Sequence, residues 1–413
     1  MNFSVPASWR SLTTPFAIAG ALAIAALGGC TPPAPPPVSV VRPQAAPVVP
    51  HPQEERQNAF LRLPNMAPGR TPVRVGIILP FSSNSPAVRG LANSMVKAAE
   101  LALFDSHNRD ILLMTADEGT GPADAAAAAS HLLEQGAEVI VGPLFGPSVS
   151  AVAPLARDHG VPVLAFSTEK SVAGNGVYLL SFLPQGEVRR VISYAASQGR
   201  TNFAALIPQT AYGDVVDKAF VDSVQRARAK VADIERFPAN ADAVMGPAGQ
   251  VAKAGADAIF IAQGGMVLRA IAPDLAFDGV DHNHVKLLGT GLWDDSSLTR
   301  ESTLYGGWFA APEPDADAEF NAKYHDTFGA PPPPLASLAY DAISLVALLA
   351  PGVPYHRFTP AALDDPNGFA GVNGIFRFNS DGTSERGLAV LEVTPDGFKI
   401  VSPAPKTFQK PGS

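Results

Sequence analysis

Hydrophobic and polar positions along most of this chain follow two patterns: the short apolar run of a buried strand and the spaced apolar face of a helix. The two patterns take turns from Val73 to Leu288. Such alternation predicts parallel sheets with helices on both faces. The expected strands are 73–79, 111–116, 138–141, 162–166, 203–208, 258–262 and 285–288, with a short one near Ile234, and the expected helices are 87–104, 123–135, 149–157, 187–197, 214–229, 244–254 and 267–275.

The alternation restarts after Phe182-Leu183-Pro184, so two consecutive doubly wound units are expected. The last part of the chain has a mixed pattern. Helical spacing covers 317–328 and 335–349, and strand-like runs cover 374–378 and 388–393. Mixed late elements indicate that the chain returns to complete both units.

The N-terminus carries a different apolar segment, from Phe16 to Leu27, followed by Gly28-Gly29-Cys30. A membrane-spanning helix needs roughly 20 apolar residues, and this run is shorter. The layout predicts an export signal peptide over residues 1–29. Leu27 to Cys30 also resembles the lipobox of bacterial lipoproteins, which implies cleavage before Cys30 and lipid attachment to it. An ordinary signal peptide with an incidental cysteine is the alternative.

Residues 30–70 have the composition of a tether. Ten prolines occur between Thr31 and Pro64, and proline-rich segments of this kind favour extended polyproline conformations over a packed core. Cys30 is the only cysteine, so the chain forms no internal disulfide. Thr31 after the lipidated cysteine implies, by resemblance, sorting to the outer membrane from the periplasmic side. A net charge of −8 argues against a nucleic-acid partner.

Several segments in a specific order resemble the type I periplasmic binding proteins, in particular the leucine/isoleucine/valine-binding branch. The resemblance covers roughly Val73 to Val401. Its motifs are VRVGIILPFS, ADEGTGPADAAAAASHLL, VIVGPLFGPSVSAVAPLARDHGVPVLAFST, AYGD, ASLAYDAISLVA and GVNGIFRFNSDG.

The resemblance implies an α/β fold of two Rossmann-like lobes that are joined by three crossovers and close on a ligand like a hinge. We expect crossovers near Leu183-Pro184, near 289–291 and near 380–385. The first lobe would then hold residues 71–183 and 291–380. The second would hold 184–290 and 381–405, and 406–413 would form a tail.

Ligands of open α/β sheets lie beyond the carboxyl ends of the parallel strands, where helix N-termini offer free N–H groups. The resemblance assigns the carboxylate of an amino-acid ligand to the loop 145–148 and to the serine and threonine after the next strand. A tyrosine of the Tyr-Gly motif would cover the ligand. The ligand-binding residues that we expect are Phe145, Ser148, Ser167, Thr168, Tyr212, Gln263 and Trp293.

Two positions depart from the pattern of amino-acid binders. Leu144-Phe145 stands where those proteins usually have a serine soon after Gly-Pro. Gln263-Gly264-Gly265 stands where they often supply an acid for the ligand ammonium. Both departures argue against a zwitterion pocket of the usual kind.

Other polar clusters have simpler interpretations. Asp117 and Glu118 are adjacent at a strand end and point in different directions, so a structural turn is favoured over catalysis. His282 and His284 lack further ligands at metal-binding spacing, which favours a solvated loop. Trp293 and the acids Asp294 and Asp295 after it are candidates for an aromatic wall and an ammonium partner of a ligand, and the acids are equally suited to capping the segment 296–300.

The stretches PFSSNSPAVRGLANSMVKAAELALFD and FSTEKSVAGNGVYLLSFLPQGEVRRVISYAASQG resemble penicillin-binding protein activator lipoproteins. That resemblance implies a non-enzymatic periplasmic lipoprotein whose partner is a peptidoglycan synthase. The alternative is a substrate-binding protein that delivers branched-chain amino acids or similar small polar solutes to an ABC permease. Phosphate-loop, zinc-protease and nucleophile-elbow motifs are missing, so we expect no catalysis, cofactor or metal.

Overall fold

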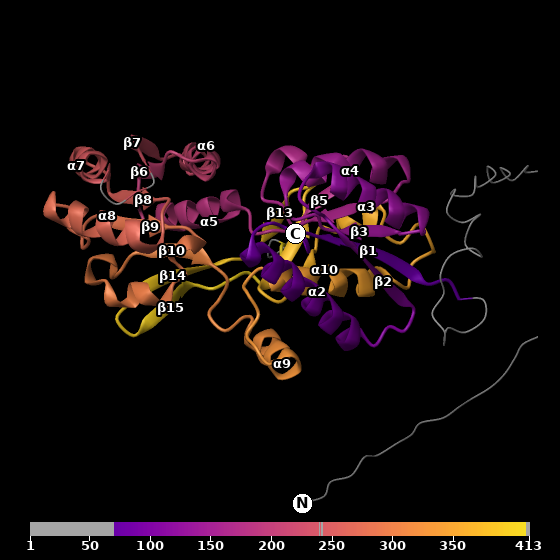
Figure 1. The fold of residues 1–413 in the computed structure, drawn as a ribbon. Coiled ribbons are helices and arrows are strands. Elements are labelled where there is room, and N and C mark those ends of the chain that lie inside the picture. Colours follow the sequence, from indigo (N-terminus) through magenta and orange to yellow (C-terminus); the bar gives the residue numbers. More distant parts are fainter. Residues whose placement is uncertain (1–69, 239, 241–242, 410–413) are drawn as a thin grey trace, which may run out of the picture. The chain divides into compact units, whose positions relative to one another are not determined.

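The computed structural model describes residues 70–238, 240 and 243–409, which belong to one compact unit (Figure 1). The expected signal peptide, the lipidated Cys30 and most of the tether lie outside the described residues. None of the helices in these ranges is both long and apolar enough to cross a membrane.

The first lobe is built on a five-stranded parallel sheet in the order β2-β1-β3-β4-β5. Helices α2 and α10 pack on one face, and α3 and α4 cover the other, as the alternating apolar pattern predicts (Figure 1). The strands are β1 (Val73–Leu79), β2 (Ile111–Asp117), β3 (Val139–Val141), β4 (Val163–Ala165) and β5 (Val177–Leu179); the helices are α2 (Pro86–Ser106), α3 (Pro122–Glu134), α4 (Gly146–Asp158), α9 (Ala318–Phe328), α10 (Ala336–Leu349) and α11 (Pro360–Leu363).

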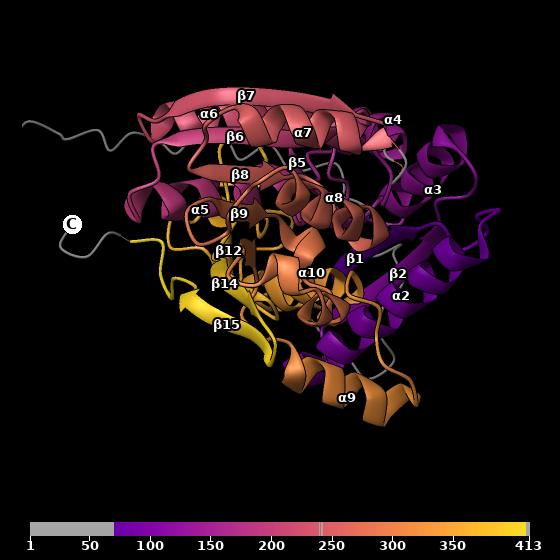
Figure 2. The ribbon, with the colours of Figure 1, turned by 90° about the vertical axis from the view of Figure 1, so that its left-hand side faces the viewer.

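The second lobe is built on a seven-stranded sheet in the order β15-β14-β10-β9-β8-β6-β7. Figure 2 shows β7, β6, β8 and β9 one below another, with β14 and β15 further down. Helices α5 and α6 pack on one face, and α7 and α8 pack on the other. The strands are β6 (Asn202–Pro208), β7 (Lys230–Phe237), β8 (Ala258–Ile261), β9 (Lys286–Gly289), β10 (Trp308–Ala311), β14 (Ala389–Thr394) and β15 (Gly397–Ser402); the helices are α5 (Pro184–Ser197), α6 (Ala211–Arg226), α7 (Met245–Lys253) and α8 (Gly265–Phe277).

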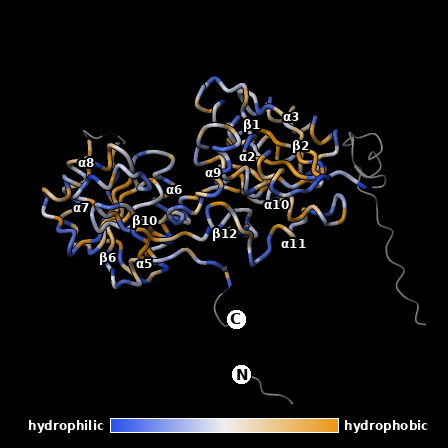
Figure 3. The backbone as a smooth tube through the Cα atoms, turned by 90° about the horizontal axis from the view of Figure 1, so that it is seen from below, coloured by the Kyte–Doolittle hydropathy of each residue, from blue (hydrophilic) through white to orange (hydrophobic). Residues whose placement is uncertain are grey.

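Local sequence explains where the helices begin. Ser85 accepts a hydrogen bond from the Val88 N–H at 3.5 Å and caps α2, and Thr210 accepts one from the Gly213 N–H at 3.1 Å and caps α6. Proline starts α2, α3 and α5, where its missing N–H costs nothing. Apolar side chains from the helices and strands then fill the interior of each lobe. The backbone trace in Figure 3 is coloured hydrophobic over many of these inner segments.

At the first crossover, β5 ends the first sheet and α5 begins at Pro184. The second crossover was placed too early. Residues 291–311 stay with the second lobe, since β10 pairs in parallel with β9, and the chain returns to the first lobe only after Ala311.

The third crossover was also placed too early. A small antiparallel sheet, β11-β12-β13, contains Ser384–Arg386 as its last strand, and β14 then joins the second sheet. The chain therefore crosses near Gly387 and Leu388. The other members of this sheet are β11 (Phe369–Gly371) and β12 (Gly374–Phe378).

A buried ion pair lies next to the first and third crossovers. The side chains of Arg386 and Asp341 are 4% and 1% exposed, and their Nη1 and Oδ2 atoms are 3.5 Å apart. The Arg386 Nε–H donates to the Ser181 carbonyl oxygen at 3.2 Å, and its guanidinium lies 4.4 Å from the ring centre of Phe182. The residue thus ties two crossovers to α10.

Candidate ligand-binding site

The loop between β3 and α4 carries the first expected ligand-binding residues. Gly142 follows β3 with a φ of +87°, and an added Cβ would overlap the Ile78 carbonyl oxygen, so only glycine fits this turn. Phe145 is the N-cap residue of α4 and is 43% exposed. Ser148, in the first turn, is 4% exposed. Phe145 therefore presents an exposed apolar surface in this loop, whereas the Ser148 hydroxyl is buried.

A carboxylate of the chain itself occupies the backbone donors of this loop. Glu118 is 1% exposed, and its carboxylate accepts hydrogen bonds from the N–H groups of Leu144 at 2.9 Å and Phe145 at 3.2 Å. The Ser148 hydroxyl also hydrogen-bonds to Glu118. Burial raises the pKa of Glu118 above its usual range, and these three hydrogen bonds oppose that effect.

Two more residues of the first lobe follow β4. Ser167 is buried, and its hydroxyl oxygen accepts a hydrogen bond from the Glu169 N–H at 3.1 Å. Thr168 is exposed. The Glu169 carboxylate lies against Gly146, where an added Cβ would overlap it. Glu118 and Glu169 thus place two carboxylates at the N-terminus of α4.

In the second lobe, Tyr212 lies in the first turn of α6 and is half-buried. Its hydroxyl is 2.9 Å from the hydroxyl of Thr290, which is fully buried at the end of β9. Burial raises the pKa of Tyr212. The hydrogen bond fixes the aromatic ring at the carboxyl ends of β6 and β9.

Trp293 does not line a cleft, which corrects the expectation. Its side chain is fully buried, its ring centre lies 6.4 Å from that of Phe309, and its indole N–H donates to the Gln263 carbonyl oxygen at 3.0 Å. The indole packs against Gly289, where an added Cβ would overlap the ring. Gln263 itself is half-buried.

Sequence reasoning missed Glu187, which lies in the first turn of α5 beside the second lobe's site. Its Oε2 accepts a hydrogen bond from the Gly291 N–H at 3.0 Å. Burial raises the pKa of Glu187 to about 7, the Gly291 N–H opposes the rise, and the charge of Asp294 adds to it. The negative charge of Glu187 also acts on the nearby Tyr212 hydroxyl.

The seven expected residues fall into two groups. Phe145, Ser148, Ser167 and Thr168 lie at strand ends of the first sheet, and the other three lie at strand ends of the second. Across the described ranges, no hydrogen bond connects one group to the other. Each group has a chain carboxylate beside it, Glu118 or Glu187.

The histidines at 282 and 284 lie in the loop before β9, as expected. The His284 Nδ1 is 2.7 Å from an oxygen of Asp281, and both side chains are at least half exposed. Nowhere in residues 70–238 or 243–409 do three or more His, Cys, Asp or Glu side chains gather in a way that suits a metal ion. The site offers hydrogen-bonding and aromatic groups suited to binding.

A sequence model of a family described as periplasmic binding protein matches residues 72–398. A curated relative, an uncharacterized protein of Rickettsia prowazekii, is 18% identical over 172 residues, which are 42% of this chain and 45% of that protein. The chain thus matches less than half the length of this relative.

Solved structures of similar fold cover four fifths of this chain. A putative branched-chain amino acid ABC transporter protein from Rhodospirillum rubrum has a TM-score of 0.70 at 18% identity, with 80% of this chain and 100% of that chain covered. A leucine-binding protein from Thermotoga maritima has a TM-score of 0.56 at 17% identity, with 80% and 98% covered. A solute-binding protein from Rhodopseudomonas palustris, in complex with 3,4-dihydroxybenzoic acid, has a TM-score of 0.57 at 19% identity, with 82% and 98% covered.

Proposed function

Since the family model covers residues 72–398, this chain belongs to the periplasmic binding proteins, and from that premise we propose that it is a non-enzymatic solute-binding protein of an ABC importer. The observation that carries the proposal is the placement of polar and aromatic side chains at the strand ends of both sheets. Thr168 is exposed at the end of β4, and the Tyr212 ring is fixed by Thr290 at the end of β6. A small polar solute between these groups would be held by both lobes.

The first test is a thermal-shift panel on residues 50–413, which include the whole compact unit. The panel contains amino acids, their amides, aromatic carboxylates and peptidoglycan fragments. A ligand at about 100 times its dissociation constant adds roughly 2.7 kcal/mol of stability, enough for a shift of several degrees. A panel without any saturable shift would count against solute import.

Variants locate the binding site once a ligand is found. Thr168→Ala and Tyr212→Phe should each weaken binding, because Thr168 is exposed at the end of β4 and the Tyr212 hydroxyl holds its ring in place through Thr290. Thr327→Ala on α9 is the matched control, since its hydroxyl bonds to the Lys323 carbonyl oxygen of the same helix at 2.8 Å. Equal affinities for all three variants, measured by isothermal titration calorimetry, would place the ligand elsewhere.

A second candidate function is activation of a peptidoglycan synthase through protein contact. The observation in its favour is that Glu118 and Glu169 already occupy the N-terminus of α4, a place otherwise suited to a ligand carboxylate. Residues 50–413 would then co-purify with the organism's bifunctional penicillin-binding proteins and change their rate of glycan polymerisation. If neither effect is seen, this candidate is removed.

We also propose that the mature protein is periplasmic and anchored by lipid on Cys30, with the outer membrane as its location. The support is the sequence Leu27 to Cys30 and the family to which the folded part belongs. Mass spectrometry of the membrane fraction should find an acylated Cys30 at the mature N-terminus. A Cys30→Ser variant that stays in the membrane fraction would contradict the anchor.

A further inference from the structure

A pocket of about 510 Å³ lies where α5, α6 and the turn between β12 and β13 meet. Its walls come from both lobes. The first lobe supplies Lys170 and residues of the turn 379–384, and the second supplies the face of α6 from Asp214 to Arg226. None of the seven residues expected to bind a ligand lines it. Its volume lies within the range of small-molecule sites, about 300–1,000 Å³.

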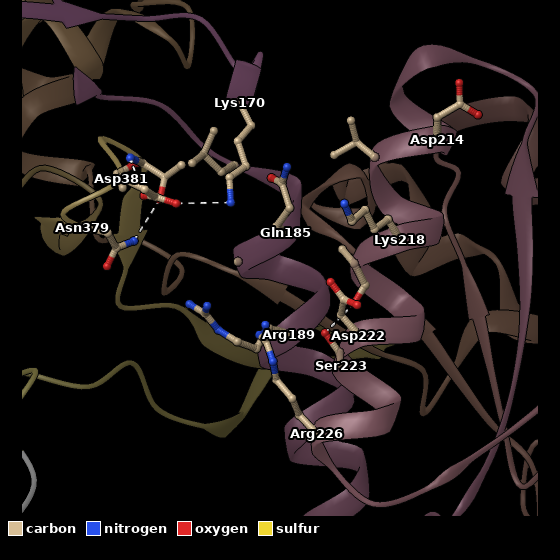
Figure 4. A pocket seen from close by; sticks show the side chains of 16 residues that line it. Lys170, Gln185, Arg189, Asp214, Lys218, Asp222, Ser223, Arg226, Asn379 and Asp381 are labelled. Carbon is tan, nitrogen blue, oxygen red and sulfur yellow. Dashed lines mark hydrogen bonds and ion pairs between the residues drawn. The ribbon is translucent and has the colours of Figure 1, made fainter. Parts of the chain in front are cut away.

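Positively charged side chains from different elements converge on this pocket. Figure 4 shows Lys170, Gln185 and Lys218 directed toward the same space, with Arg189 and Arg226 at its lower end. Lys170 belongs to the first lobe, and Lys218 belongs to α6. A ligand that touched both lysines would contact both lobes.

Two of the three acids that line the pocket are already paired with cations, one of them with Lys170 of the pocket itself. The Asp381 carboxylate lies 3.2 Å from the Lys170 ammonium, and the Asp214 carboxylate lies 2.7 Å from the Arg236 guanidinium outside the pocket. Within the part of the chain that the structure describes, Lys218 and Arg226 form no ion pair. Asp222 alone on the lining remains to balance them, so the unpaired groups leave a positive excess.

The N-terminus of α5 also borders the pocket, and the Glu187 carboxyl group lies in the same first turn. Gln185 and Gly186, in its first turn, line the pocket, and no side chain caps this end of the helix. A helix N-terminus carries a partial positive charge. Pro184 has no N–H and the Gly186 N–H donates to the Leu183 carbonyl oxygen at 2.9 Å, so Gln185 is the pocket residue of this turn whose backbone N–H makes no such bond within the described ranges. The side-chain Nε2 of Gln185, which also lines the pocket, can donate hydrogen bonds to an oxyanion.

We propose that this pocket binds a small anion that carries a carboxylate or phosphate group. This second site is separate from the strand-end site, which is the proposed solute site around Thr168, Tyr212 and Gln263. The oxyanion lies between Lys170, Lys218 and the first turn of α5. Because these groups come from both lobes, the bound anion stabilises the arrangement in which they face one another. The pocket then acts as an accessory site that biases the hinge.

The test is a titration of residues 50–413 with inorganic phosphate and, separately, with citrate, at constant ionic strength set with sodium chloride. Differential scanning fluorimetry and isothermal titration calorimetry report the response. We expect saturable binding of at least one of the two anions, and the arm that responds assigns phosphate or carboxylate chemistry. The double variant Lys218→Gln/Arg226→Gln should lower the affinity at least tenfold.

Two control variants separate this site from general charge effects and from the strand-end site. Lys253→Gln removes an exposed lysine from α7, outside the pocket, and should leave the affinity unchanged. Gln263→Ala alters the strand-end site and should also leave it unchanged. Absence of saturation with both anions, an undiminished response in the double variant, or loss of the response in Gln263→Ala would overturn the proposal.

Discussion

Replacing Glu187 with glutamine tests the carboxyl group that the structure holds between α5 and the segment after β9. Its Oε2 accepts the Gly291 N–H at 3.0 Å, and glutamine keeps both the size of the side chain and an oxygen that accepts this bond. The substitution therefore removes the titration and leaves the packing. Burial is the main reason that the pKa of Glu187 rises to about 7.

The size and sign of the effect follow from the two pKa values. Between 4.5 and about 7, the unfolded chain has an ionised Glu187 while the folded chain keeps the proton. The folded state binds more protons in this window, so its stability falls as the pH rises. At 1.36 kcal/mol per pH unit, the wild type loses up to about 3 kcal/mol relative to Glu187→Gln.

Urea unfolding of residues 50–413, followed by far-ultraviolet circular dichroism from pH 4.5 to 8, measures this difference. Asp341, whose pKa burial raises to about 6, titrates in both proteins and cancels in the comparison. Glu319→Gln is the matched control, because that side chain is 84% exposed. Parallel pH curves for the wild type and Glu187→Gln would refute the protonated, buried carboxyl.

Three further substitutions have definite expected costs. Asp341→Ala leaves Arg386 buried without its ion-pair partner and should cost about 3–5 kcal/mol in urea unfolding. The double variant Asp341→Leu/Arg386→Met should cost clearly less than Asp341→Leu and Arg386→Met added together, and additive costs would contradict the pairing. Glu118→Ala leaves the backbone N–H groups of Leu144 and Phe145 without an acceptor and should cost about 2–5 kcal/mol of unfolding free energy. It should also speed amide hydrogen exchange at Leu144, and an unchanged exchange rate there would contradict the role of Glu118. Trp293→Ala should cost about 3–5 kcal/mol, and a loss below about 1 kcal/mol would contradict its place in the core.

Periodicity predicted the long helices and strands well, because their apolar residues recur at the spacing of the face that each element buries. The runs 73–79 and 203–208 are strands in the structure, and α2 extends the expected helix by only a few residues. The short strand β10 was missed, and this error moved the second crossover. It has only four residues and follows a series of short 3-10 turns, so no alternating pattern marks it.

At the candidate site, residue types were predictable and tertiary partners were not. Serine, threonine and tyrosine residues directly after the expected strands could be identified from the sequence. The structure agrees that Asp117 and its neighbour point in different directions: Asp117 bonds to the Gly119 N–H at 2.9 Å, and Glu118 reaches a loop 26 residues away. Trp293 is buried because Gly289, in β9, leaves room for the indole, a packing relation that no local pattern reveals.

The carboxylates at the N-terminus of α4 lead to a prediction about ligand charge. A ligand carboxylate placed there would meet Glu169, which lies against Gly146, and would find the Leu144 and Phe145 N–H groups already bonded to Glu118. Like charges at this range repel, and a desolvated carboxylate without new donors is costly. If the strand-end site binds leucine-like solutes, leucinamide should therefore bind at least tenfold more tightly than leucine in calorimetry. Glu169→Gln should narrow that ratio, and Glu134→Gln, at the far end of α3, should not. If leucine binds more tightly than leucinamide, and Glu169→Gln leaves the ratio of their affinities unchanged, the ligand carboxylate is held by donors elsewhere in the site.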